Sequence, residues 1–449
     1  MDEFLHRYEM ESLQLGITAR REIIDQVRRH VRASGAVHTG LSRTDQALAA
    51  REAKAREAKE SAGEDEQEHW SMVVAGNSKE LFRNRMRNIH FVALALALEK
   101  HRLPGLIGFD LRLNHLGEEH EYDEDDVTEH NERRYALDTA THLGMLLQVY
   151  NLDSVDLSGN RIGSESLRLL SETLLQGPTT LRVLNLNGNP IGVPGLHALA
   201  EYLGSPHCAL EEVNLGNSEM EIENLITISS ALRDNHTLRV LNLDNPIIKT
   251  KEEEVVQHIG KMLQVNDTLR SISLCKHHLT DHGAQVLAER LLENRVLECL
   301  VLRANNIGAT GASALAALIL KHDALAHFDL SANRIGDVGA AAFAQVLHHN
   351  SSNLTTLSLS STYITDDGLA TIARACARPH HPDNQRLRSL LLWGNDFGPK
   401  ACELFLELCE GRFKDLGIET DFMPFRIDDQ FQVAHAETPL AKGFSSPKR

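Results

Sequence analysis

Residues 181–191 read LRVLNLNGNPI, and this pattern of leucines recurs through most of the 449-residue chain. From Leu152 onward, successive copies begin 28 to 33 residues apart, most of them 28 or 29 apart. So regular a period predicts a stack of repeats rather than one closed core. The ten copies begin at Leu106, Leu152, Leu181, Leu210, Leu238, Leu269, Leu297, Leu325, Leu354 and Leu387.

Each copy combines a strand pattern with a helix pattern. In LECLVL (297–302) the leucines alternate with other residues, so they face one side of a strand and residues such as Val301 face the other. The GASALAALILKH segment that comes next has apolar residues at helical spacing. Helices are wider than strands, so a stack of such units must curve. The sequence therefore predicts an α/β solenoid, a curved horseshoe with an inner parallel sheet and outer helices.

A polar residue follows most of the predicted strands. An asparagine amide both donates and accepts, so it can satisfy the buried backbone groups of the turn there. Ser218 and Thr362 are smaller polar substitutes, whereas Pro246 and His277 depart from the rule and predict two locally irregular turns. The asparagines at this position are Asn114, Asn160, Asn189, Asn305, Asn333 and Asn395.

Repeats of this length, with a full helix in each, resemble the ribonuclease-inhibitor-like class of leucine-rich repeats. The C-terminal segments SLLLWGNDFGPKACELF and ETDFMPFRIDDQFQVAHAE are similar to the end of the leucine-rich repeat-containing protein 34 family. Trp393, Gly394, Asn395 and Phe397 match its final turn, and Asp421, Pro424, Phe425 and Asp428 match its tail.

That resemblance implies a protein-interaction scaffold. Animal members of the family are associated with germ-line and ciliated cells, which implies a structural component of a cilium or flagellum axoneme in the cytoplasm. The alternatives are a nuclear or nucleolar regulatory binding protein, or a GTPase-activating or actin-regulating repeat protein, since the wider class contains such members. Repeat architecture by itself does not choose among these functions.

Four parts are expected from the patterns along the chain. Residues 1–77 are charged and alanine-rich, which indicates a helical extension and linker. Residues 78–105 read as one amphipathic helix that caps the first repeat. The solenoid covers 106–411 and carries an acidic insert at 118–132, and an extended tail covers 412–449.

The bulk composition narrows the function classes. The net charge of −17 disfavours direct nucleic-acid binding, which needs a basic face, and favours other proteins as partners. The acidic N-terminus MDEFLHRYEM predicts no secretory signal, and no apolar run is long enough for a membrane span. Nucleophile, phosphate-loop and metal motifs are not found in the sequence, so we expect no enzyme, no cofactor, no metal and no small-molecule substrate.

The candidate partner-binding residues fall in three places. The first is the outward-facing positions of the strands together with the aromatic exception Trp393, the second is the acidic insert, and the third is the tail. The insert could be a solvated loop or a docking site for a basic partner, and the charge run itself favours the loop. The candidates are Asp156, Asn185, Asn214, Asn242, Ser273, Asp329, Ser358, Trp393, Glu121, Asp123, Asp125, Phe425 and Asp428.

Overall fold

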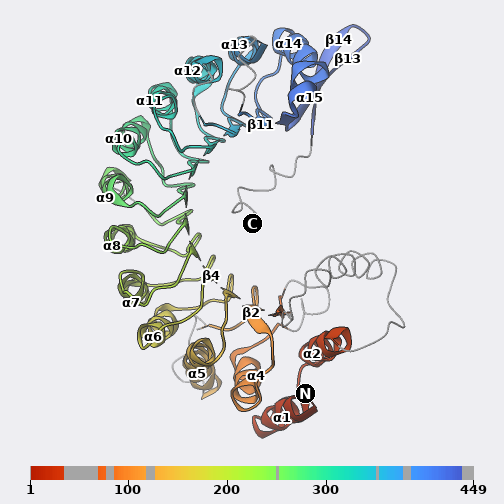
Figure 1. Ribbon diagram of the computed structural model, residues 1–449, viewed down its shortest axis with the longest axis vertical. Coiled ribbons are helices and arrows are strands. Elements are labelled where there is room, and N and C mark those ends of the chain that lie inside the picture. Colours follow the sequence, from red (N-terminus) through yellow and green to blue (C-terminus); the bar gives the residue numbers. More distant parts are fainter. Residues whose placement is uncertain are drawn as a thin grey trace, which may run out of the picture. The chain divides into compact units, whose positions relative to one another are not determined.

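Strands and helices alternate along nearly all of the computed structural model (Figure 1). It describes residues 2–34, 69–76, 85–117, 127–248, 252–349, 353–377 and 386–436. Two compact units divide the chain. Unit 1 comprises Met1–Arg161 with Thr179–Leu181, and unit 2 comprises Ile162–Pro178 with Arg182–Arg449.

Unit 2 contains one parallel sheet whose strands follow one another in chain order. Each strand pairs in register with the next, as Leu184 does with Val213 and Leu300 with Phe328. The strands are β4 (Val183–Asn185), β5 (Glu212–Asn214), β6 (Val240–Asn242), β7 (Ser271–Ser273), β8 (Cys299–Val301), β9 (His327–Asp329), β10 (Thr356–Ser358), β11 (Ser389–Leu391) and β12 (Glu419–Thr420).

A helix precedes each strand of unit 2 and packs against its neighbours on the outside of an arc, with a second, short helix before the last strand (Figure 1). The prediction of a curved horseshoe with an inner parallel sheet and outer helices is confirmed for this unit. The helices are α6 (Ser164–Leu175), α7 (Val193–Leu203), α8 (Ile222–Leu232), α9 (Glu252–Val265), α10 (Asp281–Leu291), α11 (Ala309–Ile319), α12 (Gly336–His349), α13 (Asp366–Ala377) and α14 (Pro399–Glu410).

The core of unit 2 lies between its strands and helices. The repeat leucines are almost completely buried, with Leu184, Leu300 and Leu302 at most 1% exposed. Full burial of one leucine contributes about 1.5–3 kcal/mol, so no repeat is stable without neighbours that cover it. Glycine is required where consecutive helices come closest, because a Cβ on Gly368 would lie 2.3 Å from the carboxylate of Asp337.

Unit 1 has one strand–helix pair more than the leucine pattern predicts. Strand β1 (Trp70–Val73) pairs parallel with β2 (Leu106–Asp110), which pairs with β3 (Ser154–Asp156). Helix α4 (Asn88–Lys100) follows β1, and α5 (Val127–Val149) follows β2. The single helix expected over 78–105 is therefore wrong within the described residues, because the chain is irregular at residues 85 and 86 and the helix begins at Asn88.

The face of α4 that was expected to cover the first repeat is buried. Phe91 and Leu94 are inaccessible to solvent, and the ring of Phe91 lies edge-on to Phe109 of β2 with 6.5 Å between centroids. On its other side α4 contacts α1 (Asp2–Gln14), whose Phe4 and Tyr8 are buried. Helix α1 thus covers α4, and α2 (Arg21–Ser34) contacts β1.

The C-terminal segment contains more regular structure than an extended tail. Helix α15 (Arg412–Leu416) precedes β12, and β13 (Phe422–Ile427) pairs antiparallel with β14 (Gln430–His435) to form a hairpin. Phe422 is 1% exposed, and its ring lies 4.9 Å from that of Phe405 and 5.0 Å from that of Phe397. These aromatic rings close the last repeat, where a further helix would otherwise be needed.

Candidate interaction surface

The turns that follow the strands are held by side-chain amides, as the sequence predicts. Asn333 Nδ2 donates to the carbonyls of Leu302 and Leu330 at 2.9 and 2.8 Å. Its Oδ1 accepts from the backbone N–H of Ile307 at 3.1 Å. Asn305 and Asn395 make equivalent bonds, so each amide joins its own repeat to the preceding one. We call these side chains the inner row.

The predicted irregularity at Pro246 and His277 is wrong for the described backbone. Asn245 and Lys276, which precede these two residues, have φ of 56° and 57°, the same left-handed conformation as Ala304 in a regular repeat. His277 is 1% exposed, and its Nε2 lies 2.9 Å from the carbonyl of Leu243. Burial lowers its pKa to about 4, so a neutral imidazole donates where the other turns use an amide.

The candidate residues on the strands of unit 2 also shape their own turns. The side-chain oxygens of Asn185, Asn214 and Asn242 accept the backbone N–H two residues further on, at 3.1, 3.0 and 2.9 Å. All three side chains are half-buried, and they lie on consecutive strands of one sheet. These turn bonds fix the orientation of the amides before any partner arrives.

The C-terminal half of the same strand face is more closed. Asp329 and Ser358 are 5% and 3% exposed, and Ser331 hydrogen-bonds to both of them at 2.8 and 2.6 Å. Burial raises the pKa of Asp329. Of the candidates on unit 2, these two are therefore the least accessible, whereas Ser273 is half-buried.

Asp244 was not among the sequence candidates, yet it organises the middle of this face. One carboxylate oxygen accepts from Ser273 Oγ at 2.6 Å and from the backbone N–H of Cys275 at 2.8 Å. The other accepts from Asn242 Nδ2 at 3.0 Å. Burial, reinforced by Asp244, raises the pKa of Cys275 to about 12, which keeps its thiol protonated at neutral pH.

In unit 1, Asp156 ends β3 in the same way as the amides of unit 2. Its carboxylate accepts from the backbone N–H of Ser158 at 2.9 Å and from the Ser158 hydroxyl at 2.6 Å. Burial raises the pKa of Asp110, which occupies the equivalent position on β2, and the charge of Asp156 adds to the effect. Glu121, Asp123 and Asp125 lie outside the described residues.

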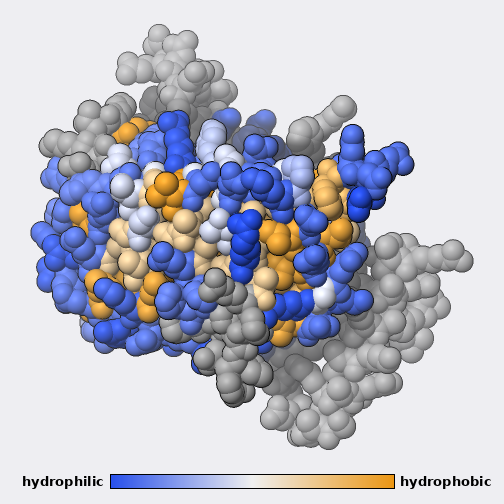
Figure 2. All heavy atoms as spheres, turned by 90° about the horizontal axis from the view of Figure 1, so that it is seen from above, coloured by the Kyte–Doolittle hydropathy of each residue, from blue (hydrophilic) through white to orange (hydrophobic). Residues whose placement is uncertain are grey.

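The structure places Trp393 beside the hairpin instead of leaving it open on the strand face. Its ring lies 5.0 Å from that of His435. Asp428 occupies the hairpin turn with φ of 46°, and Phe425 is half-buried on β13. On the same face of β13, Met423 and Ile427 are 59% and 51% exposed. Figure 2, which views this end, shows hydrophobic side chains on the surface among predominantly hydrophilic neighbours.

Asp421 closes the edge of the sheet. In earlier repeats a backbone carbonyl of the next strand accepts the N–H that follows each strand, as Asp329 O does from Leu302. At the last repeat the carboxylate of Asp421 accepts from the N–H groups of Leu392 and Trp393 at 2.7 and 3.0 Å. The side chain of Asp421, which directly follows β12, thus accepts these N–H groups where earlier repeats use a backbone carbonyl, and the matching tail residue Asp421 has a structural role.

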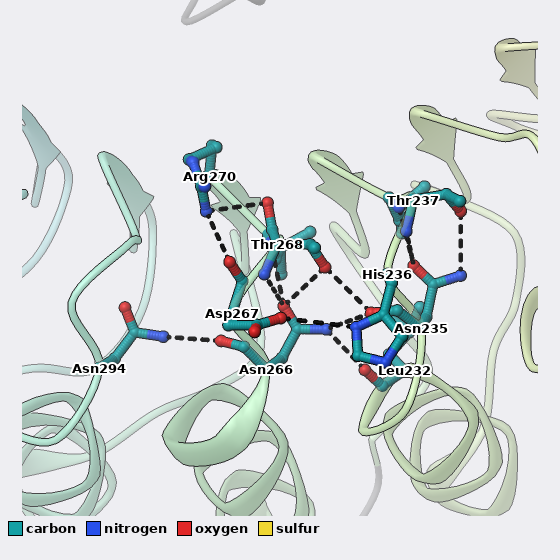
Figure 3. A network of polar contacts seen from close by, with 11 residues as sticks. Leu232, Asn235, His236, Thr237, Asn266, Asp267, Thr268, Arg270 and Asn294 are labelled. Atoms are coloured by element: carbon teal, nitrogen blue, oxygen red, sulfur yellow. Dashed lines mark hydrogen bonds and ion pairs between the residues drawn. The ribbon is translucent and has the colours of Figure 1, made fainter.

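A second row of polar residues, which the sequence pattern did not reveal, lies where helices α8 to α11 return to the sheet (Figure 3). Asn266 Nδ2 donates to the carbonyls of Leu232 and Asn235 at 2.7 and 3.1 Å, and its Oδ1 accepts from the N–H groups of Thr268 and Leu269. We call this the outer row. Its members are Asn235, Asn266, Asn294 and His322, three residues before the repeat leucine.

Carboxylates at the helix starts also connect repeats. Asp281 and Asp366 stand at the starts of α10 and α13, where a carboxylate can accept from the N–H groups of its own helix. Instead, Asp281 accepts from the N–H groups of Gly308 and Gly311, at the start of α11, at 2.6 and 3.0 Å. Asp366 accepts in the same way from Ala401 of α14 at 2.7 Å. Each carboxylate therefore stabilises the N-terminus of the next helix.

Neither a metal-binding cluster nor a membrane-spanning helix is found among the described residues. Within that part of the chain, no group of three or more His, Cys, Asp or Glu side chains is placed to hold a metal ion. The helices that the structure describes include none long and apolar enough to cross a membrane. Burial raises the pKa of Cys299 and Cys409 to about 11 and of Cys376 to about 12, so these are protonated thiols at neutral pH.

Comparison with known proteins agrees with the repeat. A family model described as "Leucine Rich repeat" matches residues 151–171, 177–200, 293–316, 325–344 and 350–373. Among solved structures, the complex of Rad7 and Elc1 in yeast shares 18% identity with a TM-score of 0.46, over 72% of this chain and 70% of that one.

Curated relatives match the chain at higher identity. Leucine-rich repeat-containing protein 34 of Mus musculus is 35% identical over 224 residues, which are 50% of this chain and 52% of the relative. The Homo sapiens protein of that name is 40% identical over 207 residues, 46% of this chain and 43% of the relative. The chain spans about half the length of these relatives. The chain thus contains leucine-rich repeats and is similar over about half of its length to leucine-rich repeat-containing protein 34.

Proposed function

We propose that the chain is a protein-interaction scaffold whose strand face in unit 2 binds segments of other proteins, and that it works within the axoneme of a cilium or flagellum. The observation that carries this proposal is the row of strand-end amides at Asn185, Asn214 and Asn242. Their oxygens are fixed by turn bonds, so binding would immobilise few additional side chains.

Charge indicates the kind of partner. The chain carries a net charge of −17, and the strand face holds the half-buried carboxylates of Glu212 and Asp244 beside the amides. A basic protein segment would be attracted to this face over a distance of about 10 Å at moderate salt. Glu121, Asp123 and Asp125 of the acidic insert are proposed as a further attraction for the same partner.

The hairpin is proposed as a second contact. Phe425 lies between the exposed side chains of Met423 and Ile427 on one face of β13, and Asp428 forms its tip. Removing the chain from Asp421 onward would also remove the aromatic and carboxylate cap, so deletion cannot separate binding from folding. Substitutions at Phe425 and Asp428 avoid that difficulty.

A native purification from ciliated cells tests the proposal. Glu212→Lys with Asn214→Lys places two positive charges on the strand face, and Arg182→Lys is a charge-conserving control outside it. We expect axonemal proteins to co-purify with the wild type and the control, and to fall at least tenfold with the double variant. Equal recovery with all three proteins would refute binding at the strand face. A co-purifying set of nuclear RNA-processing factors would refute the axonemal assignment.

A further inference from the structure

Three side-chain amides of the strand face converge on one glycine. Gly216 lies just after β5, and a Cβ on it would stand 2.7 Å from Asn242 Oδ1, 3.0 Å from Asn187 Oδ1 and 3.3 Å from Asn214 Oδ1. All three oxygens therefore lie within 3.3 Å of one point beside the glycine. We call Asn187, Asn214 and Asn242 the amide cluster. Asn187 was not among the sequence candidates, because only the pairing of β4, β5 and β6 brings it beside the other two.

Existing hydrogen bonds hold these oxygens in place without using them fully. Asn214 Oδ1 and Asn242 Oδ1 each accept the backbone N–H two residues further on, at 3.0 and 2.9 Å. Asn187 Oδ1 accepts from Asn217 Nδ2 at 2.9 Å. A carbonyl oxygen has two lone pairs, so each of the three can accept one more bond. All three side chains are half-buried, so the amide cluster offers three oriented acceptors on an accessible face.

Negative charge lies directly beside the amide cluster. The carboxylate of Asp244 accepts from Asn242 Nδ2 at 3.0 Å, which polarises this amide and makes its oxygen a stronger acceptor. Glu212 stands two residues before Asn214 on the same face of β5, and its side chain is half-buried. A cationic donor would therefore be favoured over a neutral one at this place.

The arginines of this region lie at the opposite end of the strands. Arg182 and Arg239 precede β4 and β6, and their guanidinium groups lie 3.7 and 3.9 Å from the carboxylate of Glu211. Five residues separate Arg182 from Asn187, which corresponds to about 16 Å of extended chain. Both arginines already contact a carboxylate, and Asp244 borders the amide cluster itself.

We propose that the amide cluster binds the ammonium group of a lysine side chain in a partner protein. An ammonium carries three N–H donors on one compact centre, which matches three converging acceptors, whereas a guanidinium presents a planar fork suited to a carboxylate. A calcium ion would need about six to eight oxygen ligands, more than the cluster supplies. The inference rests on the proposed scaffold function and names the side chain of the basic partner that the strand face would recognise.

Pools of tethered 12-residue peptides test this inference, with labelled full-length protein as the probe. Each pool has Lys, Arg, trimethyl-lysine or Gln at its centre, uncharged residues at the other positions and an acetylated N-terminus. Trimethyl-lysine keeps the positive charge but has no N–H donor. We therefore expect the Lys pool to retain at least fivefold more protein than the Arg and trimethyl-lysine pools, and at least tenfold more than the Gln pool. A Gln pool with a free N-terminal amine tests the other source of a primary ammonium group.

The glycine provides a variant that changes the amide cluster and little else. The Cβ of Gly216→Ala would displace three amide oxygens, which are the ends of flexible side chains, so the repeat should still fold. This variant should lower retention on the Lys pool to the level of the Gln pool. Gly204→Ala is the matched control, because its Cβ would meet its nearest atom at 3.6 Å, an ordinary contact, and retention should not change.

A second variant removes one acceptor without adding an atom near the glycine. Asn187→Ala should lower retention on the Lys pool at least fivefold, and thermal unfolding checks that all variants are folded. Equal retention of the Lys and trimethyl-lysine pools would show attraction by charge alone and would overturn the inference. The same conclusion would follow from stronger retention on Arg or on the free N-terminal amine, or from Lys selectivity that survives both Gly216→Ala and Asn187→Ala.

The native purification separates this result from the broader proposal. If the amide cluster binds a lysine of the partner, recovery should also fall with Gly216→Ala and stay unchanged with Gly204→Ala. If Gly216→Ala retains all partners while Glu212→Lys with Asn214→Lys loses them, the lysine contact is refuted and the scaffold function stands. If both variants retain all partners, binding at the strand face is refuted as well.

Discussion

Each repeat in unit 2 has two turns, one after the strand and one after the helix. Side-chain amides satisfy the buried backbone groups of both turns, but with different hydrogen bonds. In the inner row, Asn333 accepts an N–H of the preceding repeat and donates to carbonyls of both repeats. In the outer row, Asn266 accepts from its own turn and donates backward to Leu232 and Asn235. An inner amide therefore both accepts from and donates to the preceding repeat, whereas an outer amide accepts only within its own turn and only donates to the preceding repeat. We expect the inner row to contribute more to the cohesion of the stack.

The largest effect is expected for Asn333→Ala. The substitution leaves the carbonyls of Leu302 and Leu330 and the N–H of Ile307 without their partner in a site that is 0% exposed. Such losses should reduce the free energy of unfolding by about 4 kcal/mol. Chemical denaturation measures it, with the exposed neighbour Asn306→Ala as a control expected within about 0.5 kcal/mol. Equal effects of the two substitutions would contradict the role of the inner row.

Lowering the pH should reduce the stability of the protein through His277, which takes the place of an inner-row amide and can titrate. The pKa of His277 is about 4 in the folded protein against an ordinary 6.5, so the unfolded chain takes up the proton first as pH falls. The stability linked to His277 is complete above pH 6.5 and is lost between pH 6.5 and 4, by about 3 kcal/mol. Denaturation over this range should show a steeper loss for wild type than for His277→Asn. Parallel curves would mean that His277 is not buried as a neutral ring.

In the outer row, Asn266→Ala should lower stability by about 2 kcal/mol, less than its inner counterpart. Four hydrogen bonds are lost, but the turn lies next to exposed residues such as Asp267, so water can replace part of them. Asp267→Ala is the matched control and should change stability by at most about 1 kcal/mol, since its pair with His236 is exposed. An outer substitution that destabilises more than Asn333→Ala would reverse the ranking of the two rows.

The smallest expected effect is a gain in stability, for His277→Asn. Within the described residues, Nδ1 of His277 is buried without a hydrogen-bond partner. An asparagine there would keep the bond to Leu243 and could accept the N–H of Ile248, as Asn305 accepts that of Leu279. His277→Asn should therefore raise the unfolding free energy by about 1 kcal/mol at pH 7.5. A loss of stability would show that the wider imidazole fills space that an amide cannot.

The inner row could be predicted because its residues follow the leucines at a fixed offset. The outer row has the same property, since Asn235, Asn266, Asn294 and His322 stand three residues before a repeat leucine. A pattern restricted to the strand and the turn after it does not include them. Strand β1 was missed for a different reason: WSMV has none of the leucines that define the repeat, and only its pairing with β2 identifies it.

The sequence predicted which strand positions form the candidate surface. Only the structure shows which of these side chains are accessible to solvent. Asn185 and Asp329 occupy equivalent strand positions, yet the first is half-buried and the second is 5% exposed. The difference depends in part on a side chain from the neighbouring repeat, because Ser358 hydrogen-bonds to Ser331, which in turn bonds to Asp329. Ser358 lies 29 positions after Asp329, so a local sequence pattern does not include it.

The repeat, the direction of the strands and the inner faces of strand and helix are all encoded in the periodicity, because a leucine at a fixed period can be buried in only one way. The stacking of the repeats, in contrast, determines which repeat each polar side chain hydrogen-bonds to. Asp281 caps the following helix instead of its own, and the carboxylate of Asp421 accepts N–H groups of the preceding repeat. The reason is that these contacts join different repeats, so they depend on the distances and angles of stacking, which periodicity does not contain.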